Sequence, residues 1–181
     1  MDRTLELIDK YYPEDGALKR LLIRHSEDVC RKALSIIDAN PHLNIDRQFI
    51  EQAAMLHDIG IFTTDAPDIY CYGKDPYILH GRNGAELLRK EGLPRHARVC
   101  ERHTGAGLTK KSIIARNLPL PHEDFLPETI EEILICYADK FYSKSHPERT
   151  KTIEQAVRSL SKFGKDGPKR FLYWAKMFGE V

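Results

Sequence analysis

Helical periodicity over most of the chain predicts an all-α fold. Apolar residues recur at three- and four-residue spacing in one segment after another, and no convincing stretch alternates apolar and polar residues as a half-buried strand does. Proline and glycine residues stand at the ends of these segments, where helices begin and end. With 181 residues, the chain is long enough for one domain with a sizeable core.

The predicted helices follow one another along the chain, interrupted by two long irregular segments. The segments with helical spacing are 18–40, 46–58, 81–92, 94–105, 127–144, 147–164 and 166–179. Asp46 is a candidate N-cap, Pro127 a candidate helix start and Gly60 a candidate helix stop. The irregular segments 59–79 and 105–126 exceed the roughly 12 to 15 residues that are usual for a loop without a function.

Charge and composition exclude several classes of protein. The net charge is +1, from 28 basic and 27 acidic residues, which predicts neither a nucleic-acid partner nor an anionic membrane surface. No apolar run approaches the roughly 20 residues that span a bilayer, and the charged start predicts no signal peptide. The four cysteines have no CxxC spacing, which favours reduced thiols and a cytoplasmic location.

Several titratable residues fall on the apolar faces of the predicted helices. Six imidazoles and carboxylates share this property: His25, His57, Asp58, His80, His103 and Asp139. Burying one such group without a partner costs about 2 to 7 kcal/mol, and the net stability of a domain is only about 5 to 15 kcal/mol. A divalent metal would satisfy all six together, because neutral imidazole and carboxylate are its ligands.

Taken singly, each of these residues has an ordinary structural explanation. A lone histidine on an apolar face is more often a satisfied core residue than a ligand. Asp139 alone could cap a helix or form a salt bridge with a lysine, and His96 could be exposed or lie behind the ligands. Only the joint occurrence of the six residues favours a metal site.

The order of these residues resembles the HD superfamily of metal-dependent phosphohydrolases, in its HDIG branch. The resemblance is carried by His25, by the HDIG sequence at residues 57–60 and by Asp139 in YADKF, and it covers about residues 20–145. It implies an all-α HD-domain helical bundle. The chain is then expected to be a single HD/HDIG domain over 1–181, with a C-terminal helical extension at 147–181.

The resemblance also implies a set of metal ligands. The first metal would be held by His25, His57, Asp58 and Asp139; the second would be held by His80 and His103, with Asp58 bridging. The cofactor would be one or two divalent ions, namely Fe, Mn, Co, Ni, Zn or Mg. Ile61 stands where many HDIG members have lysine, and the doubled histidine and GYP of some cyclic-dinucleotide phosphodiesterases are absent.

The activity implied by the resemblance is hydrolysis of a phosphoester. A metal-bound hydroxide would attack phosphorus in a nucleotide or a small phosphorylated metabolite, with His57 and Asp58 as catalytic residues. Six cations near the proposed ligands are candidates for phosphate binding: Arg24, Arg82, Arg102, Lys110, Lys111 and Lys140. A solvated surface charge is the more common explanation for each of them taken singly.

Two other functions remain open at this point. HD-type di-iron oxygenases use the same ligand types, so the ligands alone do not separate an oxygenase from a phosphohydrolase. A non-catalytic nucleotide-binding domain is the second alternative. The expected partner is a small phosphorylated substrate, with no nucleic acid and no membrane. The aromatic residues of 163–178 are expected to be core or the contact of a possible homodimer, with a cap over the mouth of the site as the second possibility.

Overall fold

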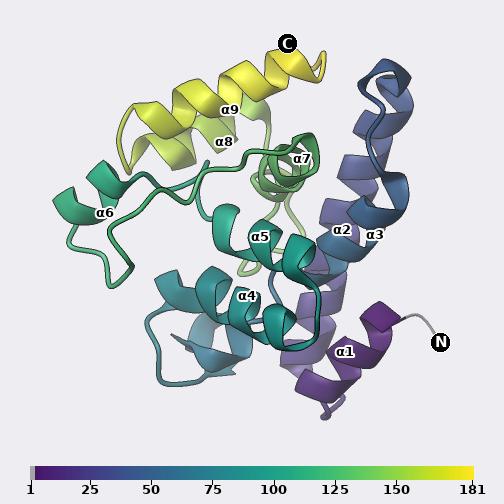
Figure 1. Cartoon of the computed structure of the whole chain (residues 1–181), viewed down its shortest axis with the longest axis vertical. Coiled ribbons are helices and arrows are strands. Elements are labelled where there is room, and N and C mark those ends of the chain that lie inside the picture. The colour runs from purple at the N-terminus through teal and green to yellow at the C-terminus, as the bar shows by residue number, and fades with distance from the viewer. Residues whose placement is uncertain (1–2) are drawn as a thin grey trace.

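In a computed structural model, which describes residues 3–181, the chain folds as the periodicity predicts, into an all-α structure (Figure 1). Residues 1–2 of the predicted domain lie outside the described range. The α-helices are α1 (Arg3–Tyr11), α2 (Ala17–Ala39), α3 (Arg47–Leu56), α4 (His80–Lys90), α5 (Pro94–Arg102), α6 (Lys110–Ala115), α7 (Ile130–Asp139), α8 (Ile153–Ser161) and α9 (Asp166–Met177). Short 3-10 turns cover Pro41–Leu43, Ile61–Thr63, Pro67–Ile69 and Tyr77–Leu79. None of the described helices is long and apolar enough to cross a membrane.

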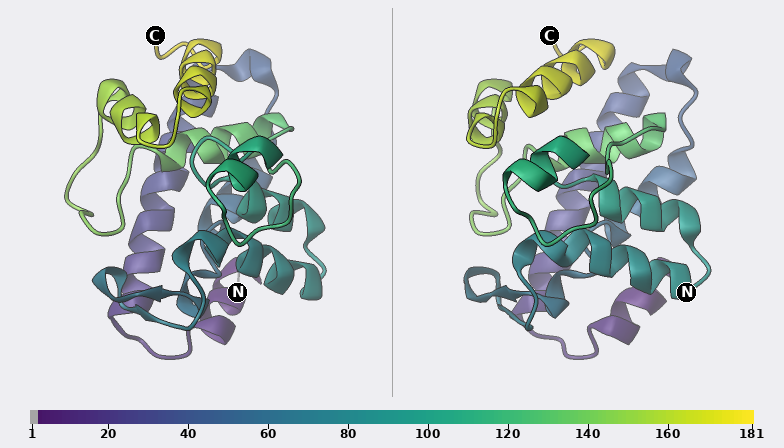
Figure 2. Two further views of the ribbon diagram at one scale, coloured as in Figure 1. Left: turned by 90° about the vertical axis from the view of Figure 1, so that its left-hand side faces the viewer. Right: turned by 60° about the vertical axis from the view of Figure 1, so that its left-hand side comes forward.

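The helices pack as two groups along the length of α2, as the two views of Figure 2 show. Helices α3, α7 and α9 enclose one apolar cluster with the C-terminal half of α2. Helices α1, α4 and α5 enclose the second with its N-terminal half. Residues at the ends of several helices therefore meet near the middle of α2, between the two clusters.

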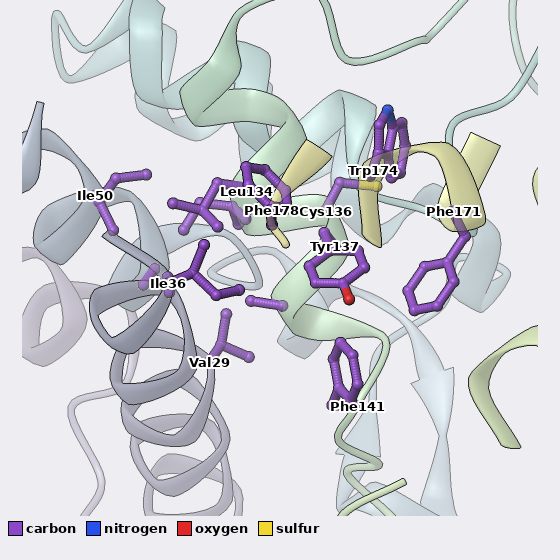
Figure 3. Packing of buried hydrophobic residues seen from close by; sticks show 14 of the residues in the cluster. Val29, Ile36, Ile50, Leu134, Cys136, Tyr137, Phe141, Phe171, Trp174 and Phe178 are labelled. Carbon is purple, nitrogen blue, oxygen red and sulfur yellow. The ribbon is translucent and has the colours of Figure 1, made fainter. Parts of the chain in front are cut away.

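The larger cluster is built around α7, whose residues 134–138 are all buried; Figure 3 shows Leu134, Cys136 and Tyr137 within it. The ring of Tyr137 stacks on Phe171 with centroids 4.7 Å apart and contacts Phe178 at 5.3 Å. Phe171, Trp174 and Phe178 are thus core residues, as expected for this segment. Rigid packing of this kind holds Asp139, at the end of α7, in a defined position.

The helix boundaries differ from the predicted ones because side-chain caps decide them. Thr129 and Thr152 each form a capping box, so α7 and α8 begin after these threonines and not near the prolines at 127 and 147. Asp46 caps α3, as predicted, by accepting a hydrogen bond from the Phe49 amide. Helices α1 and α6 lie outside the predicted segments, as does the two-stranded sheet of β1 (Asp65–Ala66) and β2 (Cys71–Tyr72).

Gly60 does not stop a helix, which corrects that prediction. Helix α3 already ends at Leu56, and the φ of Gly60 is −87°, a value that any residue adopts. A Cβ at this position would instead lie 2.4 Å from both the Gly84 amide nitrogen and the His80 carbonyl oxygen. The glycine is needed because α4 packs directly against the backbone that follows the His57–Asp58 pair.

Candidate metal centre

Six predicted ligands come together where helix ends meet the middle of α2. His25 lies on α2, and His80 is the first residue of α4. His57, His103 and Asp139 stand at or just beyond the C-terminal ends of α3, α5 and α7. Helix C-termini carry partial negative charge, so three of them directed at one place favour a cation there.

Three of the histidines are oriented by the same local device. The Nδ1 atoms of His57, His80 and His103 each lie 2.7 Å from the carbonyl oxygen three residues earlier in the chain. Because a carbonyl only accepts, each Nδ1 carries the proton and donates it. Each Nε2 therefore faces the site, and in the neutral ring its lone pair points there, the arrangement that metal-ligating histidines adopt.

The ligand atoms form two groups that share Asp58. One group contains His25, His57, Asp58 and Asp139, and the other contains Asp58, His80 and His103; within each, the ligand atoms lie within 4.8 Å of one another. Asp58 Oδ2 lies 3.3 Å from Nε2 of both His25 and His57. Asp58 Oδ1 lies 3.4 Å from His80 Nε2 and 3.2 Å from His103 Nε2. One carboxylate thus presents a different oxygen to each group.

The unsatisfied atoms of this cluster fit metal ions. Asp58 and His57 are at most 1% exposed, yet Asp58 Oδ1 and His57 Nε2 have no hydrogen-bond partner among the described residues. Burying such atoms without a partner is costly. The Nε2 atoms of His80 and His103 are only 3.1 Å apart, and both carry lone pairs because their Nδ1 atoms are the donors. Two facing lone pairs repel each other unless a proton or a metal ion lies between them.

Burial and the carboxylates set the charge states of the cluster. Burial lowers the pKa of His80 to about 3, although Asp58 opposes this, so His80 is neutral and free to coordinate. Burial also lowers the pKa of His57, but Asp58 and Asp139 outweigh it and raise the value to about 9. Burial would raise the pKa of Asp58, yet Lys144 and His57 hold it well below its usual range. Both neutral imidazole and carboxylate are therefore present.

Lys144 is a residue of the site that sequence reasoning missed. Its Nζ lies 2.5 Å from Asp58 Oδ2, and only 13% of its side chain is exposed. The segment after α7 brings it there, and Arg24 helps to hold this segment through a hydrogen bond to the Pro147 carbonyl oxygen. Lys144 is 86 residues from Asp58 in the sequence, so no local pattern predicts that the two side chains pair. The one available signal was its position five residues after Asp139, a predicted ligand.

The other residues considered at the sequence level lie in varied settings. Lys140 pairs with Asp139 and lines the cavity above the site. Arg102 binds the Leu126 carbonyl oxygen and Glu128, and Arg82 pairs with Glu86. Lys110 and Lys111 are exposed on α6. Phosphate binding by any of these cations stays a prediction.

His96 lies outside the ligand cluster. Its ring packs against Phe49 at 4.7 Å, and its Nε2 lies 3.2 Å from Gln52 Oε1. Neither ligand group contains it. Its burial is therefore satisfied by ordinary core contacts, which makes it a useful reference for the six residues of the cluster.

A model of the HD domain family matches residues 22–143 of the chain. This span contains all six clustered ligands. The chain belongs to the HD domain family. The predicted HD-domain helical bundle is thereby confirmed, and the buried histidine and aspartate cluster inside the matched span has the residue types and distances that could hold metal. No solved structure matches the chain.

Curated relatives are similar to the chain over much of its length. A tRNA (cytidine(56)-2′-O)-methyltransferase of Picrophilus torridus is 40% identical over 124 residues, 68% of the chain and 32% of the relative. The protein of the same name from Thermoplasma volcanium is 30% identical over 161 residues, 88% of the chain and 40% of the relative. An uncharacterized protein of Methanocaldococcus jannaschii is 36% identical over 107 residues, 59% of the chain and 56% of the relative. The chain therefore spans only about a third to two fifths of the methyltransferases that it matches.

These relatives overturn three of the sequence-based predictions. Their name describes methyl transfer to RNA, which contradicts both the predicted function and the predicted enzyme class, a phosphohydrolase of small molecules. It also contradicts the prediction of a small-molecule substrate without a nucleic-acid partner. The physical reason is that a set of histidines and aspartates indicates that a metal ion can bind, but does not determine which reaction the protein takes part in. Net charge, likewise, averages over the whole surface and hides local patches.

Proposed function

We propose that this chain is a metal-binding HD domain that acts in tRNA modification, with tRNA as its partner. The observation that carries the proposal is the 40% identity over 124 residues to a tRNA (cytidine(56)-2′-O)-methyltransferase. The region of similarity takes up 68% of this chain and only 32% of that relative. The chain would therefore correspond to one region of such a protein and perform only some of its functions.

In this proposal the cluster holds two transition-metal ions. Four imidazoles and two carboxylates are a donor set that suits Fe, Mn, Co, Ni or Zn better than Mg²⁺, which prefers oxygen ligands. His25, His57 and Asp139 would hold one ion, His80 and His103 the other, and Asp58 would contact both. Bound metal would supply positive charge for an RNA phosphate, and Lys140 and Lys144 at the same cavity would add to it.

The decisive test is binding of tRNA by the metal-loaded chain. Fluorescence anisotropy with a labelled tRNA transcript, competed with a duplex DNA of similar mass, should show preferential binding of the tRNA. Mass spectrometry of nuclease-digested tRNA then tells whether the chain, given S-adenosylmethionine, also forms 2′-O-methylcytidine. Equal affinity for tRNA and the DNA competitor, together with no methylation, would refute the proposal.

A further inference from the structure

The cavity above the metal centre continues into a second, basic cavity on the surface. The first encloses about 550 Å³ and reaches the site through Asp139 and Lys144. The second encloses about 540 Å³ and is lined by Arg149, Lys151 and Arg158, among others. Ser143, Lys151 and Ser159 line both cavities, so the two form one depression that runs outward from the metal centre.

Positive charge is concentrated in the segment that lines most of this depression. Residues 140–162 contain six lysines and arginines and two glutamates, a net charge of +4 in a chain whose total is +1, which leaves the rest of the chain at −3. Two aspartates, Asp68 and Asp139, also line the depression. Arg149 has 75% of its side chain exposed and forms an exposed salt bridge with Glu148, Arg158 is exposed and Lys151 is half-buried, so a ligand can reach these cations. We call Arg149, Lys151 and Arg158 the basic groove.

An apolar cavity opens from the same central cavity on its other side. It encloses about 290 Å³ and shares Tyr77, Gly105, Leu160 and Phe163 with the cavity above the metal centre. Phe163 is 60% exposed, an unusual state for so large an apolar side chain, and Arg116 lies over its ring at 4.7 Å. A partly exposed aromatic ring beside a guanidinium is a surface on which a nucleobase stacks.

We infer that the basic groove and Phe163 together bind one unpaired stretch of RNA that leads to the metal centre. The phosphates lie along Arg149, Lys151 and Arg158, and a base that has left the stack lies against Phe163 in the apolar cavity. Proteins bind single strands with the same two features, a basic groove for the phosphates and an aromatic surface for the bases. This inference rests on the proposed function, because it names the part of the RNA that the site receives.

The test compares variants of each feature with matched controls. The variant Arg149→Glu, Lys151→Glu, Arg158→Glu is compared with Lys90→Glu, which changes an exposed cation near the end of α4. Phe163→Ala is compared with Tyr173→Ala, since Tyr173 is an aromatic residue of α9 that is 66% exposed. All four proteins must match the wild type in circular dichroism and metal content before binding is measured.

The probes are a 12-nucleotide single-stranded RNA, the tRNA transcript and a duplex RNA of the same length as the single strand. We expect the triple variant to lose about tenfold or more in affinity for the single strand, with a flatter dependence on salt. Phe163→Ala should lose roughly fivefold or more, and both controls should bind like the wild type.

The outcomes separate this inference from the proposed function. If the wild type binds tRNA but the triple variant or Phe163→Ala matches its control, the inference is wrong and the proposed function stands. If duplex RNA binds as tightly as the single strand, the inference is also wrong. If the wild type binds no RNA, the proposed function fails and the inference fails with it.

Discussion

At the scale of single residues, Asp58 has the central position in the metal centre. It is the one residue that belongs to both ligand groups among the residues that the structure describes. Its two oxygens face different sets of histidines, and it is completely buried. Loss of this carboxylate should therefore affect both metal positions, whereas loss of a histidine should affect one.

The first prediction compares ligands of the two positions. Asp58→Ala should abolish binding of both ions, and His103→Ala should remove one of the two while the His25 position keeps its metal. Elemental analysis and calorimetric titration with Mn²⁺ or Co²⁺ measure the stoichiometry. His96→Ala, a buried histidine outside the cluster, is the control and should leave the stoichiometry unchanged. Equal loss of both ions in His103→Ala would argue for a single mononuclear site.

The second prediction concerns Lys144, whose ammonium group donates a hydrogen bond to Asp58 Oδ2. Lys144→Met removes a positive charge that repels an incoming metal ion, so metal affinity should rise by roughly tenfold, or about 1.4 kcal/mol. The metal-free protein should melt at a lower temperature, because Asp58 loses its buried partner. Lys162→Met, at an exposed lysine, should change neither quantity. Unchanged metal affinity in Lys144→Met would show that the lysine does not compete with metal.

At the scale of elements, the site depends on how closely α4 approaches the end of α3. His80 is the first residue of α4, and the backbone of Gly60 touches the first turns of this helix around His80 and Gly84. The 3-10 turn Tyr77–Leu79 leads into α4 and supplies the carbonyl oxygen that orients His80. Helix α4 can therefore pack this close to the end of α3 only because Gly60 has no side chain.

The third prediction follows from this approach. Gly60→Ala forces α4 away, since its Cβ would lie 2.4 Å from backbone atoms of α4, and so displaces His80 from the second ligand group. We expect the ion near His80 and His103 to be lost or weakened more than the other, with a fall in stability of about 1 to 3 kcal/mol. Metal titration and thermal melting measure the two effects. Gly167→Ala is the control, because a Cβ at Gly167, in the first turn of α9, meets only Ala106 Cβ at 3.8 Å, an ordinary contact distance.

At the scale of the whole molecule, the two apolar clusters on either side of the site hold it in place. The carboxylates and imidazoles are brought from distant parts of the chain into a buried position beneath an open cavity, where charges interact more strongly than in water. Charge is also unevenly distributed over the molecule, because residues 140–162 carry a net positive charge and the rest of the chain a net negative one.

The fourth prediction is a pH dependence of the metal-free and metal-bound states. Asp58 and Asp139 outweigh burial and raise the pKa of His57 to about 9, so its proton must leave when metal binds. Metal affinity should rise as the pH goes from 6 to 9, by up to about tenfold per pH unit for one released proton. In the metal-free protein, the stabilisation from protonated His57 is complete below the ordinary pKa of 6.5 and is lost as the pH rises through about 9. Calorimetric titration in buffers of different ionisation enthalpy counts the released protons, and a pH-independent affinity would contradict this assignment.

The amino-acid sequence by itself determined the helical class, the family and the set of six candidate ligands. Helical periodicity is a local property, and a buried histidine or carboxylate stands out wherever it interrupts an apolar face. The order of His25, the HDIG residues and Asp139 carried the family resemblance that the family model confirms. The capping boxes that set the starts of α7 and α8 are also local sequence patterns. The prolines at 127 and 147 nevertheless led to the wrong predicted start for each helix.

Only the tertiary structure decided how these parts act together. The division of Asp58 between two ligand groups, the approach of Gly60 to α4 and the pairing of Lys144 with Asp58 all join residues from different segments of the chain. The cations of the basic groove lie close together in the sequence, but only the structure shows that they line a cavity adjoining the one that reaches Asp139. The contacts of Asp58, Gly60 and Lys144 depend on which helix ends lie next to one another in the folded chain, and local sequence patterns do not predict this.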